Sequence, residues 1–269
     1  MKFLLNSKYR ILSLLCFAVL VPGLSSSASA DPIPAGWTCN GTCGSLGADG
    51  VVTLSPTGNS SYQYVTTNGS SATAVLPGKT ATSETNGSTL ATSVFAATAG
   101  TNLNFYFNFI TSDGAGFADY AWAELFDSSN VPVSLLFTAR TEPTGSIVPG
   151  IGLPAPNATL TPSSVPIIPP GPAWSPLGSS SGQCYAAGCG YTGWVNSNFT
   201  ITTAGNYYLE VGVTNWLDQA FDTGLAMDGV TVGGVPIVSP SAVPEPSTLV
   251  LLGTGLVGLA TSVKRKLRA

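Results

Sequence analysis

Residues 103–109 read LNFYFNF, with an apolar side chain at every odd position and Asn, Tyr and Asn between them. Successive side chains of a β-strand point to opposite faces of its sheet, so this period of two predicts a strand with one buried face. Residues 120–126 (YAWAELF) and 207–213 (YYLEVGV) alternate in the same way. Further strands are expected at 51–54, 62–66, 72–76, 90–98, 131–138, 199–202 and 225–232.

Residues 31–241 contain no segment of helical period that is long enough to matter, and Gly, Asn, Asp, Ser and Pro separate the expected strands. About ten strands without crossover helices predict an all-β fold, an antiparallel β-sandwich of jelly-roll type. The sequence AGNYYL at 204–209, with LAMDGV at 225–230, loosely resembles the closing half of extracellular jelly-roll modules.

Residues 142–178 interrupt this pattern, because they hold ten of the twenty prolines. Proline cannot donate to a sheet ladder, so we expect a long loop of polyproline character laid over the sandwich. The alternative is a linker between two domains. We favour the loop because the strands that follow it are too few to close a domain alone.

The basic residues mark the two ends of the chain. Seven of the nine lie in the first ten or last six residues, which leaves Lys79 and Arg140 for the body. The span 31–242 holds twelve acids, so its net charge is −10 (twelve minus two), against −4 for the whole chain. So acidic a body repels phosphate backbones, which excludes nucleic acid as an expected partner.

The first end, residues 1–30, has the pattern of a secretory signal peptide. Basic residues precede a short apolar run at 11–21, and Ala28-Ser29-Ala30 forms an A-x-A cleavage site. Cleavage between Ala30 and Asp31 after passage through the Sec translocon is the expected processing. A membrane anchor is the weaker interpretation, because the run is about eleven residues where a span needs roughly 20.

The other end, residues 242–269, reads AVPEPSTLVLLGTGLVGLATSVKRKLRA. A charge-free stretch of seventeen residues, 247–263, follows Pro244-Glu245-Pro246 and precedes four cations within the last six residues. Seventeen helical residues reach about 25 Å, enough for a transmembrane helix in a slightly thinned bilayer. The cations stay cytoplasmic under the positive-inside rule.

These features resemble a PEP-CTERM sorting domain, found on exported proteins of Gram-negative bacteria that produce exopolysaccharide. The resemblance implies recognition by an exosortase, a membrane protease, with processing near Pro244, Glu245 and Pro246. It therefore implies a precursor anchored transiently in the inner membrane and a mature protein at the cell surface or in the extracellular matrix. An ordinary C-terminal anchor explains the span and the cations but not the Pro-Glu-Pro.

Removal of the signal peptide leaves four cysteines, Cys39, Cys43, Cys184 and Cys189, in an oxidising compartment. Four cysteines allow three pairings, of which we favour the two local ones, Cys39–Cys43 and Cys184–Cys189. A zinc site is not favoured, because the spacings are wrong and the chain has no histidine.

The absence of histidine also excludes Ser-His-Asp and Cys-His catalysis, which leaves carboxylate chemistry. Paired acids serve glycoside hydrolysis, and acids with carbonyls hold calcium. Asp113 and Asp119 flank a glycine-rich turn and are candidate calcium ligands, although glycine-flanked aspartates also serve as turn formers. No other cofactor is expected, and the metal remains unassigned.

Two further acids lie in phase with apolar positions, Glu124 with Trp122 and Phe126, and Asp228 with Val230. If those faces are buried, each carboxylate needs a cation or several donors. We expect Arg140 to pair with one of them and calcium or backbone donors to hold the other.

Trp194 and Trp216 are candidate sugar contacts, since an aromatic ring beside acids and amides suits a polysaccharide-binding surface. The alternative is that such tryptophans cap the core. Three functions therefore remain: a non-enzymatic surface or matrix protein that binds exopolysaccharide, which we favour; a carboxylate-dependent glycan-cleaving enzyme; and a structural coat or spacer protein without a ligand.

Overall fold

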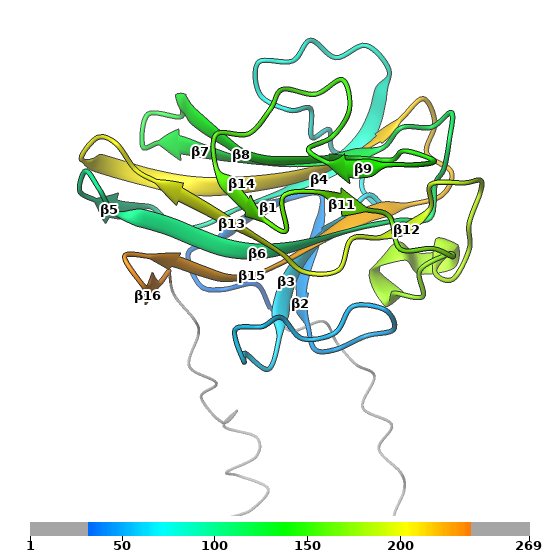
Figure 1. Ribbon diagram of the computed structural model, residues 1–269, viewed down its shortest axis with the longest axis horizontal. Coiled ribbons are helices and arrows are strands. Elements are labelled where there is room, and N and C mark those ends of the chain that lie inside the picture. The colour runs from blue at the N-terminus through cyan, green and yellow to red at the C-terminus, as the bar shows by residue number, and fades with distance from the viewer. Residues whose placement is uncertain (1–31, 238–269) are drawn as a thin grey trace, which may run out of the picture.

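The computed structural model describes residues 32–237, in which two antiparallel β-sheets pack face to face (Figure 1). The small sheet has the strand order β1 (Thr38–Asn40), β4 (Glu84–Ala91), β14 (Gly205–Trp216), β7 (Tyr120–Asp127) and β8 (Pro132–Arg140), with β5 (Phe95–Ala97) beside β14. The large sheet has the order β10 (Thr159–Thr161), β13 (Val195–Thr200), β6 (Asn102–Thr111), β15 (Thr223–Val232), β3 (Tyr62–Thr66) and β2 (Thr42–Leu46), with β12 (Gly190–Tyr191) beside β6 and β16 (Val235–Pro236) beside β15.

The core lies between the sheets and is built by the period-two residues of the long strands. Leu103, Phe105, Phe107 and Phe109 of β6 are fully buried. They meet the small sheet, where the ring of Phe137 stacks on that of Phe107 with centroids 3.8 Å apart. The alternation therefore selects one face of each strand for the core, as the sequence predicts.

The expected strands at 62–66, 103–109, 120–126, 131–138, 207–213 and 225–232 are present as β3, β6, β7, β8, β14 and β15. The segment 199–202 forms only the end of β13, and 90–98 divides between β4 and β5. Two expectations are wrong: 51–54 makes one isolated bridge, and 72–76 forms no strand. Side chains hold 72–76 in place of a ladder, because the Ala74 carbonyl accepts hydrogen bonds from the Trp122 indole and the Thr214 hydroxyl.

The segment 142–178 is largely irregular, as expected. It contributes the short strands β9 (Ser146–Val148), β10 and β11 (Val165–Pro166), and it leads into a 3₁₀ helix, η1 (Ser175–Ser180). β6 precedes this segment and β13 follows it, yet the two strands pair. The chain on both sides of the segment thus builds the same sheet.

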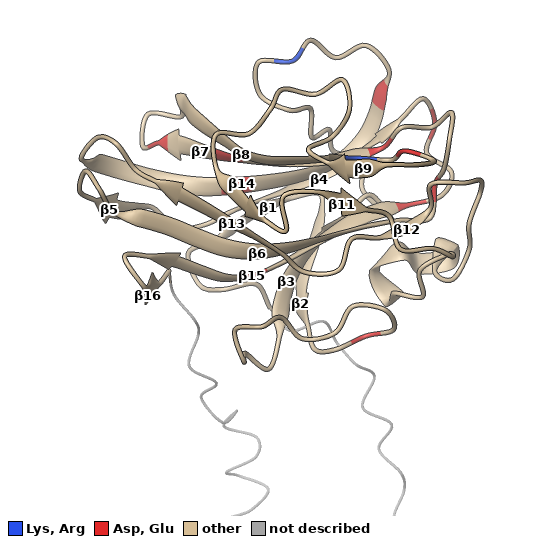
Figure 2. Ribbon diagram, viewed as in Figure 1, with Lys and Arg blue, Asp and Glu red and all other residues tan. Residues whose placement is uncertain are grey.

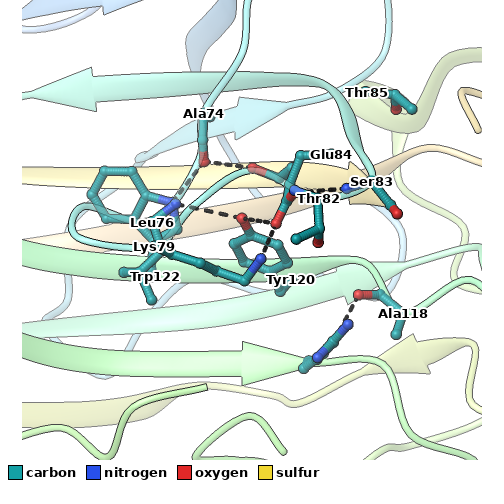
Figure 3. A network of polar contacts seen from close by, with 12 residues as sticks. Ala74, Leu76, Lys79, Thr82, Ser83, Glu84, Thr85, Ala118, Tyr120 and Trp122 are labelled. Carbon is teal, nitrogen blue, oxygen red and sulfur yellow. Dashed lines mark hydrogen bonds and ion pairs between the residues drawn. The ribbon is translucent and has the colours of Figure 1, made fainter. Parts of the chain in front are cut away.

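A loop of residues 72–83 lies over the outer face of the small sheet and is fastened by one charged group (Figure 3). The Glu84 carboxylate forms an ion pair with Lys79 and accepts hydrogen bonds from the Thr82 and Ser83 amides and the Tyr120 hydroxyl. These donors hold the pKa of Glu84 at about 2, although burial acts in the opposite direction.

Both favoured disulfides are confirmed. Cys39–Cys43 has a Cα–Cα distance of 6.1 Å, and Cys184–Cys189 has one of 5.5 Å. Cys39 belongs to β1 of the small sheet and Cys43 to β2 of the large sheet. The first disulfide therefore joins the two sheets at the point where the chain passes from one to the other.

No helix within residues 32–237 is long and apolar enough to cross a membrane. The signal peptide with its cleavage site at Ala30 and Asp31 lies outside the described residues. So do the transmembrane segment and the sorting residues Pro244, Glu245 and Pro246.

Candidate functional site

The outward side of β6 and β13 carries three amides and other neutral polar side chains, which we call the amide face: Asn104, Tyr106, Asn196 and Asn198, with Thr159 and Thr161 of the edge strand β10. The register places Asn196 beside Tyr106 and Asn198 beside Asn104. All six side chains are partly or fully exposed. β6, β10 and β13 contain no charged residue, and this part of the sheet is free of both charge colours (Figure 2).

The amides of this face are preorganised by bonds to one another. Asn104 Nδ2 donates to Asn196 Oδ1 at 3.2 Å, and Asn196 Nδ2 donates to Asn104 Oδ1 at 2.9 Å. An amide group has two donor hydrogens and two acceptor lone pairs, so this reciprocal pair leaves hydrogen-bonding capacity toward solvent. Such a fixed, neutral array can bind the hydroxyl groups of a sugar.

Trp194, one of the two predicted sugar contacts, occupies the next outward position of the same line, two residues before Asn196. Its indole Nε1 donates to the Thr53 carbonyl at 2.9 Å, and its ring meets that of Tyr62 edge-on. Two segments cover this part of the large sheet: the loop that follows Leu46, and the chain around Trp174 and Leu177 of η1. Trp194 therefore stands at the border between the covered half of the sheet and the amide face.

Trp216, the other predicted contact, is not near the amide face, because it belongs to β14 of the small sheet. The guanidinium of Arg140 lies 5.2 Å from the centre of its ring. Arg140 Nε also donates to the Ala118 carbonyl at 3.0 Å, and its Nη1 donates to the Ile151 carbonyl.

The expected ion pair of Arg140 with Glu124 or Asp228 is wrong. Lys79–Glu84 is the one ion pair among residues 32–237. Arg140 is directed away from both acids because backbone carbonyls and an aromatic ring hold its guanidinium.

Asp228 is buried, as its phase predicts, and it is satisfied by neutral donors. Oδ2 accepts hydrogen bonds from the hydroxyls of Ser55 and Thr57, and Oδ1 accepts from the Asn59 amide and from the Gly229 backbone. Its exposed fraction is 3%. The expectation of backbone donors is therefore met in part by Gly229, and side chains of the loop 55–59 supply the other donors.

Glu124 lies on the outer face of the small sheet, directly opposite Glu210 of β14. Burial raises the pKa of Glu124 to about 7 and also raises that of Glu210, where a contact with the Thr89 side chain opposes the shift. Beside them the rings of Phe126 and Tyr208 stack with centroids 5.1 Å apart. The phase of Glu124 with Trp122 and Phe126 is visible in the sequence, whereas its position opposite Glu210 follows only from the strand register.

Asp113 and Asp119 lie together at one end of the sandwich, where acidic residues gather (Figure 2). Burial raises the pKa of Asp113 to about 7, and the Asp218 carboxylate adds to this shift. Asp119 is fully buried, and burial holds its pKa well above the usual range. No group of three or more His, Cys, Asp or Glu side chains within residues 32–237 is placed to hold a metal ion.

The amide face was missed by the sequence analysis, although its signal was present. The polar positions of LNFYFNF and VNSNF carry amides, not charges. Such alternation usually marks the solvated side of a strand, so it does not by itself single out these positions as a site.

Comparison with known proteins identifies a sorting signal in the chain. Residues 242–266 match the family model of the PEP-CTERM protein-sorting motif. No curated protein matches the chain. Among solved structures, the K1 cleaved adhesin domain of Lys-gingipain (Kgp) from Porphyromonas gingivalis W83 is similar at 14% identity, over 74% of this chain and 91% of that chain, with a TM-score of 0.34. At this TM-score the likeness carries no argument.

The motif makes this chain a substrate of an exosortase. It is an exported protein, anchored in the membrane before cleavage and then released to the surface.

Proposed function

We propose that this exported protein is a non-enzymatic, jelly-roll module of the cell surface or matrix that binds exopolysaccharide through the amide face. The preorganised Asn104–Asn196 pair carries the proposal. The pair lies beside the half-exposed ring of Tyr106, and the nearest acid across the sheet, Asp228 opposite Tyr106, is buried. The two antiparallel sheets packed face to face support the jelly-roll assignment.

The chemistry of the face suits a sugar chain better than a protein partner. Pyranose rings offer apolar C–H faces, which pack on aromatic rings, and hydroxyls, which exchange hydrogen bonds with amides. The neutral face also avoids the repulsion that the acidic body, with eleven acids and two bases in residues 32–237, would exert on an anionic polysaccharide. Threonines of β10 extend the surface beyond one sugar unit.

Affinity electrophoresis of the full chain in detergent, through gels containing exopolysaccharide from a producing strain, tests this function. Retardation is expected for the wild type. Tyr106→Ala and Asn196→Ala should each weaken binding by about tenfold, the equivalent of roughly 1.4 kcal/mol for one lost stacking or hydrogen-bonding contact. Tyr208→Ala, an aromatic change on the opposite sheet, is the matched control and should bind as the wild type does.

Unretarded wild-type protein, or equal weakening by Tyr208→Ala, would contradict binding at the amide face. The first of these results would favour the third function, a coat or spacer protein without a ligand. The variants also separate the two sides of the sandwich, because Tyr106 and Tyr208 belong to different sheets.

The second candidate, a glycan-cleaving enzyme, draws support from the opposition of Glu124 and Glu210 on one face. A retaining glycosidase needs two carboxyl groups about 5–5.5 Å apart, one of them protonated near neutral pH. Burial, not the other carboxylate, is what raises the pKa of Glu124, so the two groups do not behave as a tightly coupled pair. Release of reducing ends from exopolysaccharide, lost in Glu124→Gln, would establish this activity in place of binding alone.

A further inference from the structure

The apolar core ends in a buried polar layer, which we call the end layer: Thr67, Thr111, Asp119, Asn215 and Thr223. Each member continues the inward phase of its strand. Thr111 follows Phe109 of β6, Thr223 precedes Leu225 of β15, and Asn215 follows Val213 of β14. None of the five is more than 2% exposed. The end layer therefore lies between the two sheets and not on the surface.

Asp119 is the one carboxylate of this layer, and neutral groups surround it. Oδ2 accepts a hydrogen bond from Thr223 Oγ1 at 2.5 Å, and Thr223 Oγ1 lies 2.8 Å from Thr111 Oγ1. Oδ1 accepts from the Trp216 backbone N–H at 2.8 Å. No cationic side chain within residues 32–237 pairs with it. A buried carboxylate without a cation is costly when it is ionised.

Asn215 is the second, independent feature of the layer. Both its amide nitrogen and its amide oxygen are buried and have no hydrogen-bond partner among the described residues. Buried amide groups in proteins nearly always have partners, so this pair of atoms requires an explanation.

Asn215 and Asp119 are neighbours where the pairing of β14 with β7 ends. The last paired residues are Thr214 and Tyr120, and the backbone N–H of Trp216 donates to Asp119 Oδ1, so Asn215 adjoins Asp119. Both residues are in the inward phase, Asn215 with Val213 and Asp119 with Ala121.

Two more carboxylates stand close to this pair. Asp113 and Asp218 are near enough to act on Asp119 electrostatically. The backbone N–H of Asp113 donates to Thr111 Oγ1 at 3.1 Å, which ties Asp113 to the hydroxyls of the end layer. The Asp119 carboxylate, the Asn215 amide oxygen and the hydroxyls of Thr111 and Thr223 are all hard oxygen donors.

We propose that the end layer binds one calcium ion, with the Asp119 carboxylate and the Asn215 amide oxygen as side-chain ligands. The ion supplies the positive charge that Asp119 lacks and occupies the unpartnered oxygen of Asn215. Calcium fits because it takes 6–8 oxygen ligands in irregular geometry, whereas magnesium demands a near-octahedral shell.

Hydroxyl and backbone oxygens and water complete the shell, since three carboxylates do not converge here. A dissociation constant of about 10⁻⁴–10⁻³ M, typical of extracellular modules, is expected. The proposal is independent of sugar binding at the amide face, which involves other residues.

Thermal unfolding of the full chain in detergent, after treatment with a chelator, tests the site. Calcium at about ten times its dissociation constant should raise the Tm by about 3–6 °C. Asp119→Asn retains an oxygen for the Trp216 N–H but removes the charge, so the shift should vanish. Asp127→Asn, at the other end of β7, is the matched control and should keep it. The proposal is overturned if calcium does not raise the Tm of the wild type, if it still raises the Tm of Asp119→Asn, or if it no longer raises that of Asp127→Asn.

Terbium luminescence tests the site while the residues that are proposed to bind the ion remain unchanged. Terbium replaces calcium at oxygen sites and is excited through a nearby indole. Trp216 adjoins Asn215, and its backbone N–H donates to Asp119, so Trp216→Phe should remove most of the calcium-displaceable emission, whereas Trp194→Phe, directly before β13 of the large sheet, should not. Equal losses in the two variants, or emission that calcium does not displace, places the ion elsewhere and overturns the assignment.

Discussion

Gly212 of β14 is a residue whose missing side chain shapes the outer face of the small sheet. A methyl group at this position would lie 2.5 Å from the ring carbons Cε2 and Cζ2 of Trp122, which is 1% exposed. The indole is also fixed by its hydrogen bond to the Ala74 carbonyl, so it cannot move away freely. Gly212→Ala should therefore destabilise the fold by about 1–3 kcal/mol, the usual cost of overpacking.

Urea unfolding of the full chain in detergent measures this difference. Gly47→Ala is the matched control, because a methyl there would meet its nearest atom, the Ser60 carbonyl oxygen, at an ordinary 3.7 Å. The two variants should differ by at least 1 kcal/mol. Equal stabilities would show that the indole of Trp122 is not held in place.

The buried acids predict that stability falls as pH rises toward neutrality. Asp113 and Glu124 have pKa values of about 7, and that of Asp119 is higher than usual, whereas unfolded Asp and Glu titrate near 4. Between about pH 4 and 7 the unfolded chain therefore releases protons that the folded protein keeps. The free energy of unfolding should decrease over this interval.

Chemical denaturation at a series of pH values, in the presence of a chelator, measures this dependence. Below about pH 4 the sign reverses, because Glu84 titrates at about 2 when folded and near 4 when unfolded. The maximum of stability should lie near pH 4. Stability that is flat or rises from pH 4 to 7 would contradict the burial of these acids.

At the residue scale, the sequence predicted burial better than partners. The period-two phase of Glu124 and Asp228 correctly placed both carboxylates in buried positions. It could not identify the donors of Asp228, because Ser55, Thr57 and Asn59 come from a loop about 170 residues earlier in the chain. The phase also could not show that the guanidinium of Arg140 donates to backbone carbonyls. Partners depend on loop paths, which alternation does not encode.

At the scale of elements, the loop 72–83 is fastened by the ion pair of Lys79 with Glu84. Lys79→Met removes the cation but keeps the length of the side chain. The free energy of unfolding of the variant should be about 1–3 kcal/mol lower near neutral pH, since a charged hydrogen bond to a largely buried carboxylate is lost. The difference from the wild type should shrink as the pH falls toward 2, because Glu84 of the wild type, with a pKa of about 2, then becomes protonated in the folded state.

Denaturation curves of the two proteins at pH 6 and pH 2 test this prediction. Thr80→Ala is the matched control in the same loop. A deficit that persists unchanged at pH 2 would indicate that Lys79 contributes through its packing over the Tyr120 ring, not through charge.

The disulfide Cys39–Cys43 closes a short loop but connects two sheets. Conversion of both cysteines to serine should lower the free energy of unfolding by about 2 kcal/mol, according to the loop-entropy relation. It should also speed amide hydrogen exchange in β1, an edge strand of three residues that pairs only with β4. Replacement of Cys184 and Cys189 should leave exchange in β1 unchanged. Equal protection of β1 in both double variants would show that the strand does not need the bond.

Elements with continuous alternation were predictable, and elements held by side chains were not. β6, β7 and β14 are long enough for the pattern to mark both ends within a few residues. The segment 72–76 also reads as a strand, but it lies across a sheet, with the Ala74 carbonyl bound to Trp122 and Thr214. Short edge strands such as β1 and β2 went unnoticed because three to five residues around a glycine carry too little pattern.

At the scale of the whole molecule, the distribution of charge separates the body from its two ends. Residues 32–237 carry eleven acids and two bases, while the remaining cations belong to the terminal segments. The sequence alone was enough to infer export and sorting, because these depend on linear motifs that act without a folded context. The sequence indicated Asp119 and the amides of 103–109 one by one, but it could not show which residues they meet, since the amide face and the end layer each join strands far apart in the sequence.

Release from the membrane should depend on the tripeptide before the apolar segment. Pro244 and Pro246 stand directly before the segment that we expect to span the bilayer, and proline disfavours the continuation of a helix. Replacement of Pro244, Glu245 and Pro246 by alanine removes the recognition element and also lets a helix extend through this stretch. In a host with an exosortase, the variant should accumulate as an anchored precursor while the wild type is released.

Fractionation with immunoblotting measures this release, and Tyr208→Ala in the body should be released as the wild type is. Equal release of the alanine variant would show that processing does not require the motif, and the same retention of wild-type protein in a host without exosortase would identify the enzyme responsible.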